Sequence, residues 1–152
     1  MKKILFLVLV ISVFIAGCAT KEMNVATIKL DKGLYEIISE DTILLSNQHI
    51  KPHTSNLIIF SKPNEFLSYL EQKFRIAGYG VLVTSEEITL KENDYNFGYI
   101  LDTINKTKIG KSVTRTLRYT VQLNKTACSK LYEITDNKEL LFKSDWFCNI
   151  GE

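Results

Sequence analysis

The sequence predicts a small α+β domain in which a mostly antiparallel sheet packs on one main helix. Three observations lead to this prediction. A strand, a helix and a second strand follow one another between residues 56 and 84. From residue 97 to 147 the chain reads as successive strands separated by turn residues, which is typical of an antiparallel meander. Residues 19 to 55, in contrast, are the least regular part of the chain.

The chain begins with two lysines and an almost unbroken apolar run from Ile4 to Ile15. This order is typical of an export signal, and the run is shorter than the roughly 18 residues that a spanning helix needs. The following Ala16-Gly17-Cys18 completes a pattern that resembles the lipobox of bacterial lipoprotein signal peptides. The resemblance implies that residues 1–17 are removed and that Cys18 becomes the lipidated first residue. A plain signal peptide with an incidental cysteine and an N-terminal anchor helix are the alternatives.

A lipidated Cys18 would attach the chain to membrane lipid. Two or three acyl chains such as palmitate anchor a protein stably, whereas one chain gives only marginal binding. In enterobacterial lipoproteins an Asp after the cysteine favours the inner membrane, and this chain has Ala19 there. The resemblance therefore implies the outer membrane, with the domain facing the periplasm. Residues 18–55 are expected to form the lipidated N-terminus and an irregular tether with short docking elements, followed by the α+β domain at 56–150.

Charge argues against a nucleic-acid partner. The chain has 19 Lys and Arg against 17 Asp and Glu, and the two lysines of the signal account for the excess. Nucleic-acid binding requires clustered basic charge.

Residue patterns also give little support for catalysis. His49 and His53 are four residues apart, but Pro52 between them disfavours a helical metal site, so we expect two solvated loop histidines. The adjacent Glu86 and Glu87 would point to opposite faces of a strand, which is poor geometry for acid–base work. We expect no enzyme, no cofactor and no metal site.

The strand–helix–strand unit has clear boundaries. Asn56 to Phe60 is a continuous apolar run, typical of a buried strand. An apolar stripe at helical spacing follows, and Gly78 suits the position just after the helix end. This stripe consists of Phe66, Leu67, Leu70, Phe74 and Ala77. Tyr79 to Thr84 is the second strand.

Four further strands are expected after a polar, acidic loop at residues 85–96. They run from Phe97 to Ile104, Val113 to Leu123, Ala127 to Thr135 and Leu140 to Phe147. Turns are expected at residues 105–111, 124–126 and 136–139. The strand from Val113 to Leu123 alternates apolar and polar residues, so one of its faces should be buried.

The last hairpin predicts a disulfide. If its loop is centred near Lys138, Cys128 and Cys148 face each other across two antiparallel strands. Such pairs lie within the Cα separation that a disulfide requires. The bond would close a loop of about 20 residues, contributing about 3 kcal/mol in the chain-entropy account. The alternative is two buried free thiols.

Aromatic residues are numerous for so small a domain, and a minority of them could form a partner-binding patch on the open face of the sheet. The set considered is Tyr69, Tyr95, Phe97, Tyr99, Tyr119, Tyr132, Trp146 and Phe147.

Several segments together resemble TrbH-type conjugal transfer lipoproteins over about residues 53 to 147. The segments are Thr54 to Phe60, the helix from Phe66 to Ala77, Gly78 to Val81, Gly98 to Asp102, Leu117 to Leu123 and Ser129 to Tyr132. The resemblance implies a structural or assembly component of a conjugation (type IV secretion) apparatus at the outer membrane. Its partners would be protein subunits of an envelope-spanning complex, in which it could form an oligomer. The alternative is a periplasm-facing lipoprotein that binds a small ligand or inhibits an envelope enzyme.

Overall fold

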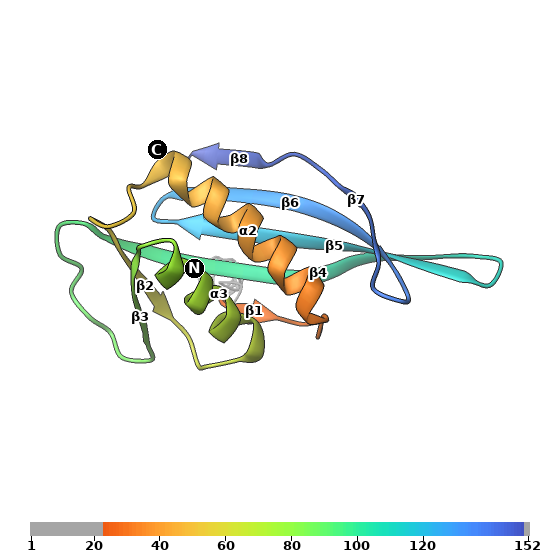
Figure 1. The fold of residues 1–152 in the computed structure, drawn as a ribbon, viewed down its shortest axis with the longest axis horizontal. Coiled ribbons are helices and arrows are strands. Elements are labelled where there is room, and N and C mark those ends of the chain that lie inside the picture. The colour runs from red at the N-terminus through yellow and green to blue at the C-terminus, as the bar shows by residue number, and fades with distance from the viewer. Residues whose placement is uncertain (1–22, 151–152) are drawn as a thin grey trace, which may run out of the picture.

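A mixed sheet, covered on one face by two helices, organises residues 23–150, which are the residues that the computed structural model describes (Figure 1). The strand order is β3-β2-β4-β5-β6-β7, with β1 beside β4 and β8 beside β6. The expected signal peptide at 1–17 and Cys18 lie outside the described residues.

Three strand pairs are parallel and the others are antiparallel. β2 is parallel to both β3 and β4, and β1 is parallel to β4. The expectation of a mostly antiparallel sheet is thus corrected to a mixed one. The helix between β2 and β3 is a crossover connection, and such a connection returns the chain in the same direction. The strands are β1 Val25–Ala26, β2 Asn56–Phe60, β3 Gly80–Thr84, β4 Asp94–Ile109, β5 Ser112–Leu123, β6 Thr126–Thr135, β7 Leu140–Lys143 and β8 Phe147–Ile150.

Helix α3, Glu65–Ile76, confirms the predicted crossover helix. The Asn64 side chain caps it by accepting a hydrogen bond from the Leu67 N–H at 2.9 Å. Gly78 follows the helix end with φ +92°, a conformation that favours glycine. The buried face consists of Phe66, Leu67, Leu70 and Phe74, as the apolar stripe predicts.

Helix α2, Lys32–His49, corrects the expectation of an irregular tether and of one main helix. Its start is capped by Asp31, which accepts from the Leu34 N–H at 2.9 Å. Half of its buried face is polar, so the apolar stripe that usually reveals a helix is interrupted. The buried residues are Leu34, Tyr35, Ile38, Ser39, Asp41, Thr42, Leu45 and Ser46.

Aromatic rings fill the space between the helices and the sheet. Phe66 of α3 makes edge-to-face contacts with Tyr99 and Tyr119, at ring-centroid distances of 5.1 and 5.8 Å. Phe74 contacts Phe97 in the same way at 5.1 Å. These contacts join α3 to the central strands β4 and β5. α2 packs on the same face of the sheet (Figure 1).

The β4–β5 hairpin is longer than expected. The predicted turn at residues 105–111 is mostly strand, because β4 and β5 remain paired as far as Ile109 and Ser112. The turn itself is confined to Gly110 and Lys111, and Gly110 has φ +61°. A register shift between Thr103 and Asn105 marks the point where the hairpin leaves the body of the domain.

Candidate functional site

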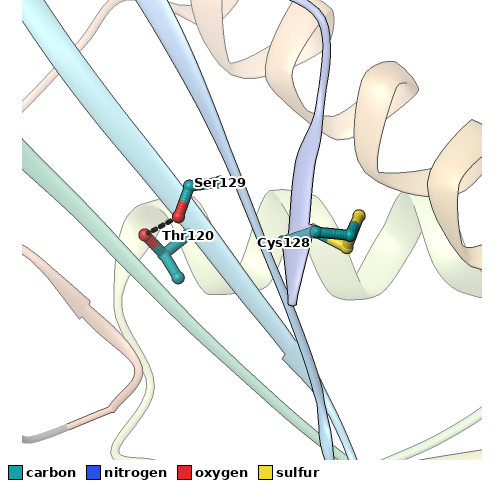
Figure 2. The surroundings of a disulfide bond; sticks show 4 residues. Thr120, Cys128 and Ser129 are labelled. Atoms are coloured by element: carbon teal, nitrogen blue, oxygen red, sulfur yellow. Dashed lines mark hydrogen bonds between the residues drawn. A yellow bond between two sulfur atoms is a disulfide. The ribbon is translucent and has the colours of Figure 1, made fainter. Parts of the chain in front are cut away.

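The predicted disulfide joins β6 to β8. Cys128 and Cys148 are directly opposite each other, with Cα atoms 4.0 Å apart and the sulfurs bonded. Cys128 and its neighbour Ser129 project to opposite sides of β6, and the Ser129 hydroxyl lies 2.9 Å from that of Thr120 on β5 (Figure 2). The last predicted strand is in fact two strands, β7 and β8, which together hold the C-terminal end of the sheet against β6.

His49 lies next to this disulfide. One ring nitrogen of His49 and the sulfurs of Cys128 and Cys148 are within 4.8 Å of one another. A metal would require thiolate sulfurs, and both sulfurs are held in the disulfide. The ring of His53 packs on Gly78, and the backbone N–H of His53 donates to the Gly78 carbonyl at 2.7 Å. His53 is exposed in a turn, as the sequence suggests, whereas His49 is exposed but is the last residue of α2 rather than part of a loop.

A buried charged cluster lies between α2 and the sheet, and sequence reasoning missed it. The Asp41 carboxylate is 3.1 Å from the Lys130 Nζ and 3.0 Å from the Lys143 Nζ. Tyr132 donates its hydroxyl hydrogen to the same carboxylate at 2.9 Å. The Lys130 ammonium also lies over the ring of Trp146, 5.5 Å from its centroid. The cluster thus joins α2 to β6, β7 and the segment that leads into β8.

Electrostatics keeps the Asp41 carboxyl ionised. Burial by itself would raise its pKa, but hydrogen bonds from Lys143, Lys130 and Tyr132 outweigh burial, and the pKa lies below its usual value. Burial, together with the neighbouring Asp41 charge, raises the pKa of Tyr132. Tyr132 therefore stays a neutral donor. These groups support one another as a structural unit, with α2 supplying the anion and the sheet supplying the cations.

Comparison with known protein families gives a match to the conjugal transfer protein TrbH model over residues 19–144. The match covers more than half of the chain and includes both helices and strands β1 to β7. The chain belongs to the TrbH family. A comparison with curated proteins found no match. Membership makes this protein a conjugal transfer component, and such a component works with protein partners.

The TrbH-family chain exposes two phenylalanines at its C-terminal edge, which we call the phenylalanine edge. Phe142 of β7 is 54% exposed and Phe147 of β8 is 67% exposed. They pair with Glu133 and Ser129 of β6, four residues apart, so they share one face of the sheet. The neighbouring Lys143 reaches Asp41 on the helix side, so the phenylalanine edge lies on the face that the helices leave open.

Most of the other predicted aromatic candidates are interior. Phe97, Tyr99, Tyr119 and Tyr132 are buried, and burial raises the pKa of Tyr99 to about 12. Phe147 is the candidate that the structure leaves exposed. Phe142 was missed because an apolar run in a closing strand gives no indication of which residues face solvent.

An open groove of about 870 Å³ lies where β1 and the start of α3 meet the sheet. Asn24 and Asn64 line it, but both amides are already engaged within the domain. Asn24 bonds the backbone of Phe60 and Tyr99, and Asn64 caps α3 and bonds the Tyr99 hydroxyl. These two asparagines therefore stabilise the fold, and their amides are not free to bind a ligand. Within residues 23–150, neither helix is long and apolar enough to cross a bilayer.

Proposed function

We propose that this TrbH-family protein is an outer-membrane lipoprotein that serves as a structural and assembly component of a conjugation apparatus. Lipid on Cys18 anchors it, and the domain faces the periplasm. Family membership supports the conjugal transfer role and suggests an envelope location. The sequence that ends in Ala16-Gly17-Cys18 supports the lipid anchor.

One observation carries the assembly part of the proposal, and it is the phenylalanine edge. Two large apolar side chains on one face of a sheet edge are costly to leave in water. Here they are held by strands that the disulfide and the Asp41 cluster fix to the domain. Rigidly presented aromatic side chains are typical of protein interfaces, since little conformational entropy is lost when they dock. The edge thus fits an apolar surface on another transfer subunit.

We also propose that the role is not enzymatic. The Asp41 carboxylate, whose pKa is lowered, is buried, is paired with two lysines and accepts a hydrogen bond from Tyr132. An acid or base in catalysis must instead reach a substrate proton. The alternative of small-ligand binding would use the groove beside β1, where the asparagine amides are already bonded to the protein. The assembly role is therefore the better-supported one.

The interface is tested in donor cells that carry the transfer machinery, with the full chain tagged at its C-terminus. Phe142→Thr with Phe147→Thr keeps strand-forming residues but removes the apolar surface. We expect this variant to lose co-purification with other transfer proteins and to lower plasmid transfer. Ile76→Ala, which changes an exposed apolar residue on α3 (74% exposed), should leave both unchanged. The proposal would be contradicted if the double variant co-purified with transfer proteins and supported plasmid transfer at wild-type levels.

The anchor is tested separately with Cys18→Ser. We expect this variant to lose incorporation of labelled palmitate and to leave the membrane fraction. Labelling equal to wild type would show that Cys18 is not the acylated residue. This experiment leaves the interface result unaffected, because it concerns the attachment alone.

A further inference from the structure

The outer part of the β4–β5 hairpin, residues 103–116, forms a projection that we call the cationic arm. Its strands pair with each other as far as Ile109 and Ser112. β5 meets β6 only from Thr114 onward, and the described partners of β4 on its other side end at Leu101. Figure 1 shows the arm extending beyond the rest of the molecule. Because Thr114 to Thr116 still pair with β6, only the tip of the arm, residues 108–113, is two-stranded. A two-stranded ribbon is only marginally stable in water without a third element.

The arm carries charge of one sign. No Asp or Glu occurs between Asp102 and Glu133 in the sequence, whereas the arm contains Lys106, Lys108, Lys111 and Arg115. Arg115 pairs with Asp136 at 3.2 Å. The three lysines are exposed and form no ion pair within residues 23–150. Three uncompensated cations on a narrow ribbon produce a local field that attracts an acidic surface.

The opposite end of the molecule carries the complementary charge, on a segment that we call the acidic loop, residues 85–93. Glu86, Glu87 and Glu92 are exposed and form no ion pair within the described part of the chain. Lys91 is the cation of this loop. In Figure 1 the acidic loop, which connects β3 to β4, and the cationic arm lie at the two ends of the long axis.

Apolar side chains accompany the charges at both ends. Ile104, at the base of the arm, is 47% exposed. Leu82 of β3 and Leu90 of the acidic loop are 47% and 41% exposed. Each end therefore offers an apolar contact beside its charges, and an interface between them would bury carbon as well as pair ions.

We infer that the partner of the cationic arm is a second copy of this chain, whose acidic loop and adjoining β3 edge receive the arm. The three lysines of one copy face the three glutamates of the next, and Ile104 packs beside Leu82 and Leu90. Because arm and loop are different surfaces at opposite ends, the contact is head-to-tail and can be repeated by further copies. The inference rests on the proposed function, since it names one contact by which this assembly component associates.

The test is a charge swap in the full-length, lipid-anchored protein, with two differently tagged copies expressed in donor cells. Arm reversal is Lys106→Glu, Lys108→Glu and Lys111→Glu; loop reversal is Glu86→Lys, Glu87→Lys and Glu92→Lys. Either reversal alone places like charges together, so we expect cross-linked copies to fall at least about tenfold. Co-expression of the two reversed proteins, or both reversals in one chain, should restore cross-linking. All six positions are exposed, and an unchanged melting temperature is the check on folding.

Three outcomes would overturn the inference. The first is that both single reversals cross-link to the same extent as the wild type. The second is that combining the two reversals does not restore cross-linking. The third is that wild-type copies never cross-link, yet the arm reversal abolishes plasmid transfer. The partner of the arm would then be another, acidic subunit. Deletion of the whole chain separates this result from the proposed function. If deletion leaves plasmid transfer unchanged, the proposed function fails, whatever the arm does.

Discussion

The two helices lie on the same face of the sheet but are held there by different forces. α3 presents Phe66, Leu67, Leu70 and Phe74, an apolar face that packs against aromatic rings. α2 buries Ser39, Asp41, Thr42 and Ser46 together with its apolar residues. Asp41 pairs with two lysines, and Thr42 donates to its own helix and contacts the Tyr119 hydroxyl at 3.1 Å. Packing thus secures α3, whereas directed polar contacts set the position of α2.

This difference has a physical consequence. Apolar packing tolerates a small displacement of a helix, because a shifted apolar side chain still finds carbon atoms to pack against. A buried carboxylate between two ammonium groups does not tolerate such a displacement, because each charge must stay close to its partner. The position of α2 should therefore be more sharply specified than its apolar content alone would predict.

The largest loss of unfolding free energy is expected in the apolar face of α3. Phe74→Ala removes a ring that is fully buried between Tyr79 and Phe97, and should cost about 3–5 kcal/mol of unfolding free energy. Urea unfolding followed by circular dichroism measures the loss. Ile76→Ala, on the exposed side of α3, is the matched control and should change the free energy by less than about 0.5 kcal/mol. Similar losses in both variants would show that α3 does not depend on its apolar face.

The second-largest loss of unfolding free energy is expected at the polar contacts of α2. Asp41→Asn leaves the Lys130 ammonium buried without a counter-charge, and should cost about 3 kcal/mol. Glu40→Gln, one residue earlier and exposed, is the control and should be close to neutral. Combining Asp41→Leu with Lys130→Met should recover much of the stability, since replacing a buried ion pair with apolar residues is often neutral. An unstable combined variant would mean that the helix needs the pair itself.

A somewhat smaller loss is expected at the C-terminal edge. Cys128→Ser with Cys148→Ser removes the bond that closes a 20-residue separation, and should cost about 2–3 kcal/mol. Reduction of the wild-type protein should lower its urea midpoint to a similar extent. The same treatment of the double serine variant should have no effect. A reduced wild-type midpoint equal to the oxidised one would show that the Asp41 cluster alone holds β8.

The smallest effect is the response to mild acid. The pKa of Asp41 is lowered in the folded chain, so its contribution is complete above the unfolded value of about 3.9 and is lost as pH falls through the folded pKa. Urea midpoints measured from pH 6 to pH 3 should therefore fall below pH 4 in the wild type. The fall should be less steep in Asp41→Asn. Parallel pH profiles of the two proteins would contradict the assignment.

The same contrast explains what the sequence could predict. The apolar stripe of α3 and the alternation in β5 depend on local periodicity, and the pairing of Cys128 with Cys148 depends on the position of a turn nearby in the sequence. The structure confirms all three. The family could likewise be recognised from short core patterns. α2 was missed because four of its buried residues are polar and interrupt the apolar stripe, and because Asp41 finds its partners 91 and 102 residues away.

The cationic arm was missed for a related reason. Residues 105–111 are mostly polar and contain a glycine, which is typical of a turn. Residues 105–109 nevertheless belong to β4, because β5 supplies them with hydrogen-bond partners. Which residues of a short polar segment pair and which turn depends on register, and register is set by the longer β4–β5 ladder that continues into the core.

The contact between Asp41 and Lys143 also bears on the order in which the domain folds as the chain is synthesised. The two residues are 102 positions apart, and Cys148 follows Lys143 by only five residues. During synthesis from the N-terminus, α2 emerges long before the lysine and the cysteine that complete its surroundings. The polar contacts of α2 with β6 and β7 can therefore form only after these strands have been synthesised. Closure of the domain is thus a late step, because it needs residues close to the C-terminal end of the sheet.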